Sequence, residues 1–221
     1  FFTLLPALPL TFFLAIGSFV FGAALGFVFA VIRVYEVKYL NALLMLYISF
    51  FRGTPLLVQL FMFYYGLPIV LQSYAIGIDL HNLDGLYYAL IVFSLYASAY
   101  LCEIFRAALL YVDKGQIEAA YSLGMTNTQA LRRIILPQAF MITLPNLLNF
   151  FIMQVKNTAL ASIIAVPELM GLADIESGRS SKFLEVYLMA ALMYWVMCVV
   201  LEAVFSKIEK HFAKFRKKYA K

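Results

Sequence analysis

Long apolar runs separated by short charged stretches dominate the pattern of this chain. A helix needs roughly 20 apolar residues to cross a bilayer. Five runs are long enough, and we expect spans at about residues 8–32, 55–71, 86–111, 137–156 and 184–206. Each span should be a helix, because backbone groups in lipid must find hydrogen bonds within their own segment. The pattern therefore predicts an all-α integral membrane protein with a single transmembrane domain, residues 1–221.

Shorter features between the spans predict local structure. The apolar stretch Tyr39–Phe51 is too short to cross and predicts a buried or interfacial helix. Residues 157–167 are also short, so we expect a re-entrant segment or a cap over the bundle. Pro55 suits the first position of a helix capped by Thr54. From Leu201 onward, apolar and basic residues recur at helical spacing and predict an amphipathic helix on the inner leaflet.

The composition excludes most soluble classes. Hydrophobic residues make up 64% of the chain and charged residues 13%, which fits neither a soluble domain nor a disordered one. The net charge of +5 does not indicate nucleic-acid binding, because seven of the 17 Lys and Arg lie between Lys207 and Lys221, after the last span. The pattern holds no phosphate-binding loop and no nucleophile–base set, so we expect no catalytic residue and no enzyme activity in this chain.

Cysteine and histidine usage predicts neither a disulfide nor a metal site. Cys102 and Cys198 lie inside apolar runs and should be buried, reduced thiols. His81 and His211 are far apart in sequence, which does not fit the ligand spacing of a zinc site. We also see no basic, apolar leader typical of a secretory signal.

The distribution of basic residues predicts the orientation. If the N-terminus is outside, the outer segments hold only Lys156, Arg179 and Lys182. The inner segments then hold the other basic positions that flank the spans, namely Arg33, Lys38, Arg52, Lys114, Arg132, Arg133 and the seven of the tail. Inner loops of membrane proteins are enriched in Lys and Arg, so we expect the N-terminus outside and the C-terminus inside. The loop over residues 72–84 has no Lys or Arg and suits the outer side.

The inner loop at about residues 113–133 carries the most specific motif. Glu118, Ala119 and Ala120 are followed by Gly124 and then by Ile134-x-Leu136-Pro137. At a helix start, Glu118 would lie near positive dipole ends, and the two alanines would let the helix fit a groove on another protein. Gly124 would allow the backbone to reverse. Such a short helix cannot bury enough surface alone, so the loop predicts a docking partner.

This motif resembles the cytoplasmic signature of ABC-importer permeases. Other stretches resemble the polar amino-acid branch of that family, the histidine, glutamine and arginine permeases: Phe50–Pro55, Tyr100-x-x-Glu103-x-x-Arg106, Asp113–Gln116 and Lys156-Asn157-Thr158. Ala159 after Thr158 is a departure, because relatives often have Ser there. The resemblance implies a type I ABC importer permease-like fold with a cytoplasmic coupling helix, in a multi-pass protein of the bacterial cytoplasmic membrane.

The resemblance also implies partners. The permease would pair with an identical or paralogous permease subunit, dock on two ABC ATPase subunits, and receive a polar amino acid from an extracytoplasmic binding protein. ATP and Mg²⁺ would be bound by the ATPase, so we expect no cofactor in this chain. Glu118, Ala119, Ala120 and Gly124 would couple ATP hydrolysis to movement of the spans.

A carboxylate within the third span is the strongest candidate for a substrate contact. Glu103 shares a helix face with Tyr96, Ala99, Tyr100 and Ala107. Intramembrane charges usually face a cavity or a partner. Glu103 could therefore line a pocket for a cationic group, or it could pair with Arg106. Asn157 can donate and accept hydrogen bonds to an amino-acid zwitterion, or it could cap its helix. We take Glu103, Tyr100, Asn157 and Thr158 as the substrate-binding candidates.

Two other functions fit a polytopic membrane protein. An ion-coupled secondary transporter would show inverted repeats and paired broken helices. A channel would show rings of pore-lining polar groups or a filter sequence. The chain displays neither pattern. The substrate stays open, since Glu103 could hold either a basic side chain or the α-amino group.

Overall fold

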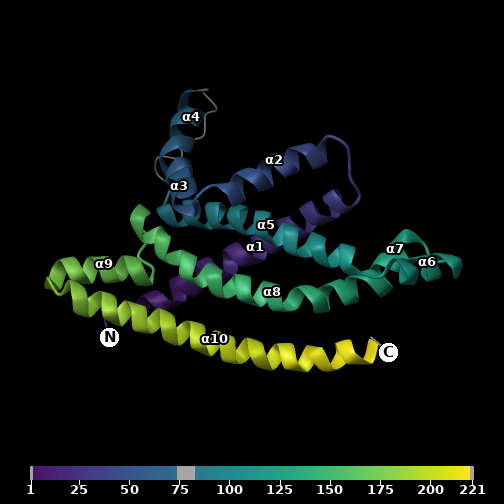
Figure 1. The fold of residues 1–221 in the computed structure, drawn as a ribbon. Coiled ribbons are helices and arrows are strands. Elements are labelled where there is room, and N and C mark those ends of the chain that lie inside the picture. The colour runs from purple at the N-terminus through teal and green to yellow at the C-terminus, as the bar shows by residue number, and fades with distance from the viewer. Residues whose placement is uncertain (1, 74–82, 220–221) are drawn as a thin grey trace.

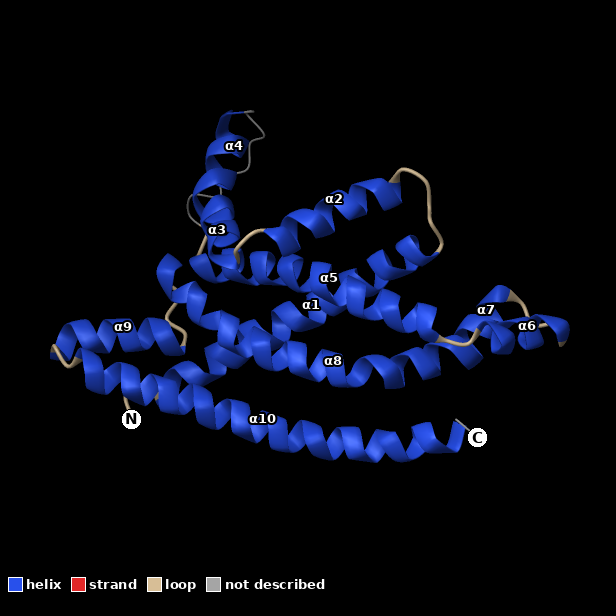
Figure 2. Ribbon diagram, viewed as in Figure 1, coloured by secondary structure: helices blue, strands red, loops and turns tan. Residues whose placement is uncertain are grey.

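The structure, a computed structural model, describes residues 2–73 and 83–219 and is helical almost throughout (Figures 1 and 2). Most of the expected outer loop at 72–84, including His81, lies outside these residues. The elements are η1 (Leu5–Ala7), α1 (Leu8–Val34), α2 (Leu40–Gly53), α3 (Leu56–Phe61), the π-helical η2 (Met62–Gly66), α4 (Leu67–Ser73), α5 (Gly85–Tyr111), α6 (Lys114–Ser122), α7 (Asn127–Ala130), the π-helical η3 (Leu131–Ile135), α8 (Leu136–Asn157), η4 (Thr158–Ile164), α9 (Leu169–Ser180) and α10 (Phe183–Tyr219).

Within residues 2–73 and 83–219, four helices are long and apolar enough to cross a membrane: Leu5–Val34, Gly85–Tyr111, Asn127–Ile164 and Phe183–Phe212. The helices α1, α5, α8 and α10 begin within one residue of the starts expected from the apolar runs. In Figure 1 they extend between two ends of the molecule. The N-terminus and α9 lie at one end, and α6, α7 and the C-terminus lie at the other.

A fifth candidate crossing is a bent pair of helices. The helices Leu40–Gly53 and Leu56–Gln72 are long and apolar enough to cross only when taken together, and the chain bends by 111° between them, which is the geometry of a broken span or of a re-entrant loop. The break falls where Thr54 is extended (φ −116°, ψ 148°) before Pro55, as the steric restriction on a residue preceding proline requires. The expected cap is wrong: Pro55 itself is the N-cap of α3, and the Thr54 hydroxyl donates to the Phe50 carbonyl (2.8 Å).

The helix α5 is the centre of the bundle. In the most apolar stretch of α5, 61% of the residues are buried, whereas in the corresponding stretch of α10 only 17% are. It packs closely on α1 at two glycines. A Cβ on Gly22 would lie 2.5 Å from the Ala97 Cβ, and one on Gly26 would lie 2.9 Å from the Ser98 carbonyl oxygen. Small residues at such crossings let helix backbones approach in membranes, which fixes α1 against α5.

A buried carboxylate organises the end that carries α9. Glu168 is fully buried and caps α9 by accepting hydrogen bonds from the Met170 and Gly171 amides (2.8 and 3.0 Å). It also accepts from the Tyr194 hydroxyl of α10 (2.8 Å), and Thr11 of α1 lies 3.5 Å away. Burial raises the pKa of this carboxyl, although the hydrogen bonds from Tyr194 and the backbone oppose the shift. The segment after Asn157 is thus η4 followed by α9, and α9 was not expected from the sequence.

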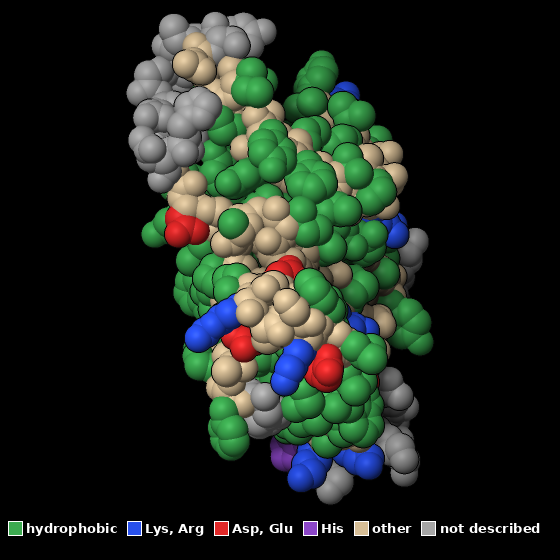
Figure 3. Space-filling model, turned by 90° about the vertical axis from the view of Figure 1, so that its left-hand side faces the viewer, with side chains coloured by type: hydrophobic (Ala, Val, Ile, Leu, Met, Phe, Trp, Pro, Cys, Tyr) green, Lys and Arg blue, Asp and Glu red, His purple; other side chains and the backbone are tan. Residues whose placement is uncertain are grey.

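The outer surface is apolar. Figure 3 views the molecule from the α9 end, where hydrophobic side chains cover most of the visible surface. Phe21 of α1 and Trp195 of α10 are 59% and 64% exposed, as suits helices in lipid. The tail is a helix that continues directly from the last span, as predicted. Up to Phe212 it continues α10 along α8, with ring contacts Phe205–Phe151 (5.9 Å) and Phe212–Phe140 (6.2 Å).

Candidate functional site

Glu103 of α5 lies among three arginines from three helices. Its carboxylate is ion-paired with Arg33 of α1 and with Arg106 of α5, whose Nη2 is 3.0 Å from Oε2. The Nη1 atom of Arg52, from α2, lies 3.9 Å from Glu103 Oε1. The pairing with Arg106 that the sequence left open is therefore present, together with a second pairing to Arg33. Since three guanidinium groups surround one carboxylate, the cluster has an excess of two positive charges, and Glu103 already has its counterions.

Tyr100 connects this cluster to α8. The Arg52 guanidinium lies over the Tyr100 ring, 5.4 Å from its centroid, at a distance typical of cation–π contacts. The same ring contacts Tyr96 (4.6 Å) and Phe150 of α8 (5.9 Å). The Arg52 side chain is 45% exposed, against 14% for Arg33 and 33% for Arg106. Arg52 is therefore the arginine of the cluster most open to a ligand.

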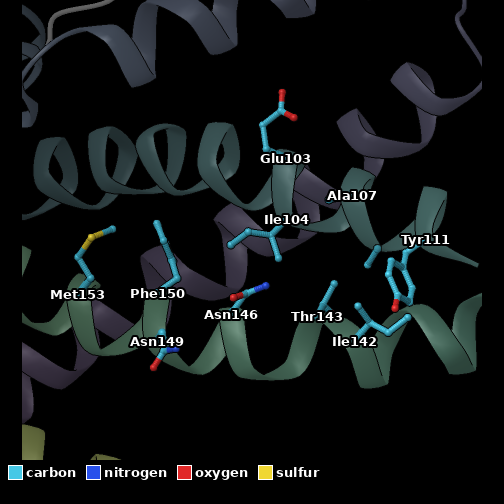
Figure 4. A pocket seen from close by; sticks show the side chains of 11 residues that line it. Glu103, Ile104, Ala107, Tyr111, Ile142, Thr143, Asn146, Asn149, Phe150 and Met153 are labelled. Atoms are coloured by element: carbon cyan, nitrogen blue, oxygen red, sulfur yellow. The ribbon is translucent and has the colours of Figure 1, made fainter. Parts of the chain in front are cut away.

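A cavity of about 590 Å³ lies between α5 and α8. Its lining is Glu103, Ile104, Ala107, Ala108 and Tyr111 from α5, and Ile142, Thr143, Asn146, Asn149, Phe150 and Met153 from α8. Figure 4 shows that the Glu103 carboxylate points away from α8. The Thr143 hydroxyl donates back to the Ala139 and Phe140 carbonyls (3.1 and 2.9 Å). The amides of Asn146 and Asn149 are thus the main uncommitted polar groups on the α8 side.

Asn157 and Thr158 lie apart from this cavity. Asn157 ends α8, eight residues after Asn149, which is about 12 Å along a helix. Thr158 is fully buried, and its hydroxyl donates to the Val155 carbonyl (2.8 Å). The Asn157 amide nitrogen is buried without a hydrogen-bond partner in the described part of the chain. The structure therefore brings Glu103 and Tyr100 together and leaves the other two candidates at the far end of α8.

The motif loop forms a hairpin, α6–α7, beyond the ends of α5 and α8 (Figure 1). Gly124 makes the turn with φ +77°, in the left-handed region that glycine adopts without strain, so the predicted reversal is confirmed. The expected helix start at Glu118 is wrong. The helix α6 begins four residues earlier at Lys114, with Asp113 accepting from the Gly115 amide (2.6 Å), so Glu118 lies mid-helix.

The hairpin presents one face outward and attaches to α8 by the other. Glu118 is exposed and is not among the residues that line the cavity on the α8 side, so it belongs to the outward face. Ala119 and Leu123 are also exposed, Leu123 at 79%, but both border that cavity. Ala120 is buried and lines a cavity of about 510 Å³ between the hairpin and the start of α8. Across it the Gln138 side chain of α8 donates to the Gln116 side chain (2.7 Å). A force on the hairpin would therefore reach α8 directly.

Comparison with known proteins assigns the chain and its fold to a family. Residues 22–214 match the family described as the binding-protein-dependent transport system inner membrane component. The chain belongs to this family. The permease is 45% identical to a probable amino-acid ABC transporter permease protein, PatM, of Vibrio harveyi, over 91% of this chain and 87% of that one. It is 41% identical to the L-cystine transport system permease protein TcyL of Bacillus subtilis, over 96% and 88%.

A solved structure supports the same assignment. The crystal structure of an amino acid ABC transporter with histidines has a chain that is 33% identical to this permease. The two superpose with a TM-score of 0.84, covering 95% of this chain and 94% of the other. The permease is thus an amino-acid ABC transporter permease by family and by fold, and the resemblance inferred from its motifs is confirmed.

Sequence reasoning missed three of the permease residues at this site. Arg33 was counted only as an inner flanking charge, although it pairs with Glu103. Asn146 and Asn149 were not considered, although two amides three residues apart in an apolar span are a readable signal of a polar helix face. Within the described part of the chain, no three His, Cys, Asp or Glu side chains are grouped as a metal site would need.

Proposed function

We propose that this permease forms the membrane pathway of a bacterial ABC importer for polar amino acids. The observation that carries the proposal is the pairing of two features: a cavity between two spans whose mainly apolar lining includes the Asn146 and Asn149 amides, and an exposed hairpin attached to one of those spans. The relatives PatM and TcyL are described as an amino-acid and an L-cystine permease, which supports amino acids as the substrate class.

The family of this chain supports three kinds of partner. ATP and Mg²⁺ would be bound by separate ABC ATPase subunits, with α6–α7 seated in a groove on the ATPase. A second permease subunit, identical or paralogous, would complete the pathway, and an extracytoplasmic binding protein would deliver the substrate. The apolar belt of exposed side chains supports a place in the cytoplasmic membrane. The placement of basic residues supports an outer N-terminus and an inner C-terminus.

The substrate contacts would divide between two levels of the bundle. At the α9 end, the unpartnered Asn157 amide supports a first contact, with the buried Thr158 holding that turn in place. Deeper in the bundle, the exposed guanidinium of Arg52 over Tyr100 suits the substrate's carboxylate. Glu103 would meet a cationic group of the substrate only when movement of α1 or α5 releases one of its arginine partners.

Uptake into proteoliposomes tests this function. The permease is reconstituted with its ATPase subunits, and the binding protein is added outside. We expect uptake of glutamine, cystine or arginine that requires both internal ATP and the binding protein and survives ionophores. Uptake that ionophores abolish while ATP is present would assign the chain to secondary transport, and uptake without ATP or gradients would assign it to the channels.

A further inference from the structure

Two asparagines give α8 a polar face inside a membrane span. Asn146 and Asn149 lie within the apolar segment Asn127–Ile164, and both are exposed. Neither carboxamide has a hydrogen bond to another residue in the part of the chain that the structure describes. Their spacing of three residues places them on one side of the helix, and both line the α5–α8 cavity.

This face is not suited to lipid. An amide without a hydrogen-bond partner is strongly unfavourable in hydrocarbon, because no water is present to satisfy it. The same helix also exposes Phe140, which is 51% exposed and does suit lipid or an apolar contact. The difference between the two faces of α8 indicates that Asn146 and Asn149 border water or a polar ligand.

The cavity offers hydrogen bonds but no free charge. Among the described residues that line it, only Glu103 is charged, and its carboxylate points away from α8 (Figure 4). That carboxylate is already ion-paired with Arg33 and Arg106. Each carboxamide can donate two hydrogen bonds and accept others. The volume of about 590 Å³ falls in the range of about 300–1,000 Å³ typical of small-ligand pockets. Such a site suits a ligand that is polar and has no net charge.

We propose that Asn146 and Asn149 form an amide subsite for the transported amino acid, selective for polar side chains without charge over basic ones. This rests on the proposed function and names its substrate class. The polar groups of the bound amino acid would replace the water that these amides otherwise face. The two asparagines would therefore determine which amino acids bind in the α5–α8 cavity.

Cysteine accessibility tests the hydration of the face. Asn146→Cys and Asn149→Cys are made separately in a Cys198→Ser background, in the reconstituted permease–ATPase complex; Cys102 is buried. The control is Val196→Cys on α10, which is 51% exposed on an apolar surface. We expect a charged, membrane-impermeant thiol reagent to modify positions 146 and 149 at least about tenfold faster than position 196, because the reactive thiolate forms only in water. Equal rates, as for burial against lipid or against another permease subunit, would overturn the proposal.

Equilibrium binding tests the specificity. Radiolabelled glutamine, cystine and arginine are bound to the purified permease–ATPase complex. We expect glutamine or cystine to bind more tightly than arginine, and Asn146→Leu or Asn149→Leu to raise the Kd about fivefold each, as loss of one neutral hydrogen bond does. Asn149→Gln, which keeps the amide, should stay within about twofold, and Phe140→Leu should have no effect. Asn149→Asp should shift preference toward arginine by about tenfold.

The two proposals fail in different ways. Absence of ATP-dependent uptake of all three amino acids would contradict the proposed function, while the labelling rates would still decide whether the face is hydrated. Normal uptake combined with an unchanged Kd in both Leu variants, or with tighter binding of arginine than of the other two, would contradict the amide subsite alone.

Discussion

Arg33 at the end of α1 and Glu103 of α5 form an ion pair across a sequence separation of 70 residues. The pair joins the two helices that Gly22 and Gly26 bring into close contact. Removing one member of a partly buried pair leaves the other charge without its counterion, which costs more than the pair itself contributes. This relationship makes the stability of the bundle sensitive to Glu103.

Neutralising Glu103 should therefore destabilise the protein before it affects a ligand. We expect Glu103→Gln to lower the free energy of unfolding in detergent by about 2 kcal/mol, as for a charged hydrogen-bond partner. The double variant with Arg33→Gln should be less destabilised than the sum of the single variants. Arg52→Gln is the control. The Arg52 side chain is 45% exposed and its Nη1 lies 3.9 Å from Glu103 Oε1, so this substitution should change the stability little. Unchanged stability with weaker ligand binding would instead make Glu103 a ligand contact.

Gly124 should be required for coupling. Any other residue is strained at φ +77°, so Gly124→Ala should distort the α6–α7 turn and reduce transport-coupled ATPase activity while the spans stay folded. Gly178→Ala is the matched control, because that glycine lies in α9 with open space around it. ATPase stimulation and co-purification of the ATPase are measured for both. A fully coupled Gly124→Phe complex would refute the docking role of the hairpin.

Glu118→Lys tests the outward face of the same hairpin. Glu118 is exposed in the middle of α6, so charge reversal should leave the fold intact and weaken the ATPase contact. Co-purification of the ATPase is again the measurement, and Arg132→Glu, exposed on η3, serves as the reversal control. Retention of the ATPase by Glu118→Lys at the wild-type level would move the contact elsewhere on the hairpin.

Orientation can be decided by labelling in intact cells. Gln72 and Thr128 are both exposed, at the end of α4 and in the hairpin. In the Cys198→Ser background, we expect an impermeant reagent to reach Gln72→Cys from outside and Thr128→Cys only after the membrane is opened. The reverse pattern would overturn both the orientation and the docking of an inner ATPase.

The stability should depend on pH through Glu168. Because burial raises its pKa, the folded protein holds this proton more tightly than the unfolded chain. The free energy of unfolding should therefore fall as pH rises above the ordinary value of 4.5, until the pKa of the folded state is passed. Glu168→Gln should remove that dependence. The measurement is thermal unfolding in detergent at a series of pH values from 5 upward. If stability depends on pH equally in the wild-type protein and in Glu168→Gln, Glu168 is not the group responsible.

Truncating Glu168 to alanine should lower the free energy of unfolding more than Glu168→Gln does. Glu168→Ala leaves the Tyr194 hydroxyl and two α9 amides without an acceptor, and we expect a loss of about 2–3 kcal/mol. Glu176→Ala, a half-buried carboxylate on the same helix, should change stability by less than about 0.5 kcal/mol. Similar losses in both variants would show that Glu168 does not organise this end of the bundle.

The starts of the long helices could be predicted from the sequence because lipid imposes a local rule. Each spanning segment must satisfy its own backbone and cover itself with apolar side chains, so a run of residues such as 8–32 carries its own structure. The backbone reversal at Gly124 could be predicted for a similar reason, since glycine itself permits a positive φ. The start of α6 differs from the expected one, because the side chain of Asp113 caps the helix four residues before Glu118.

Only the tertiary structure decided which charges and amides meet. Spacing along α5 could suggest Arg106 as a partner of Glu103, but Arg33 is brought there by the packing of α1 on α5. The same holds for Glu168, whose partners Thr11 and Tyr194 come from the first and last spans. It also holds for the α5–α8 cavity, whose polar side is a property of two helices together. Helix formation in a membrane is local, whereas the pairing of polar groups depends on how helices distant in sequence pack against one another.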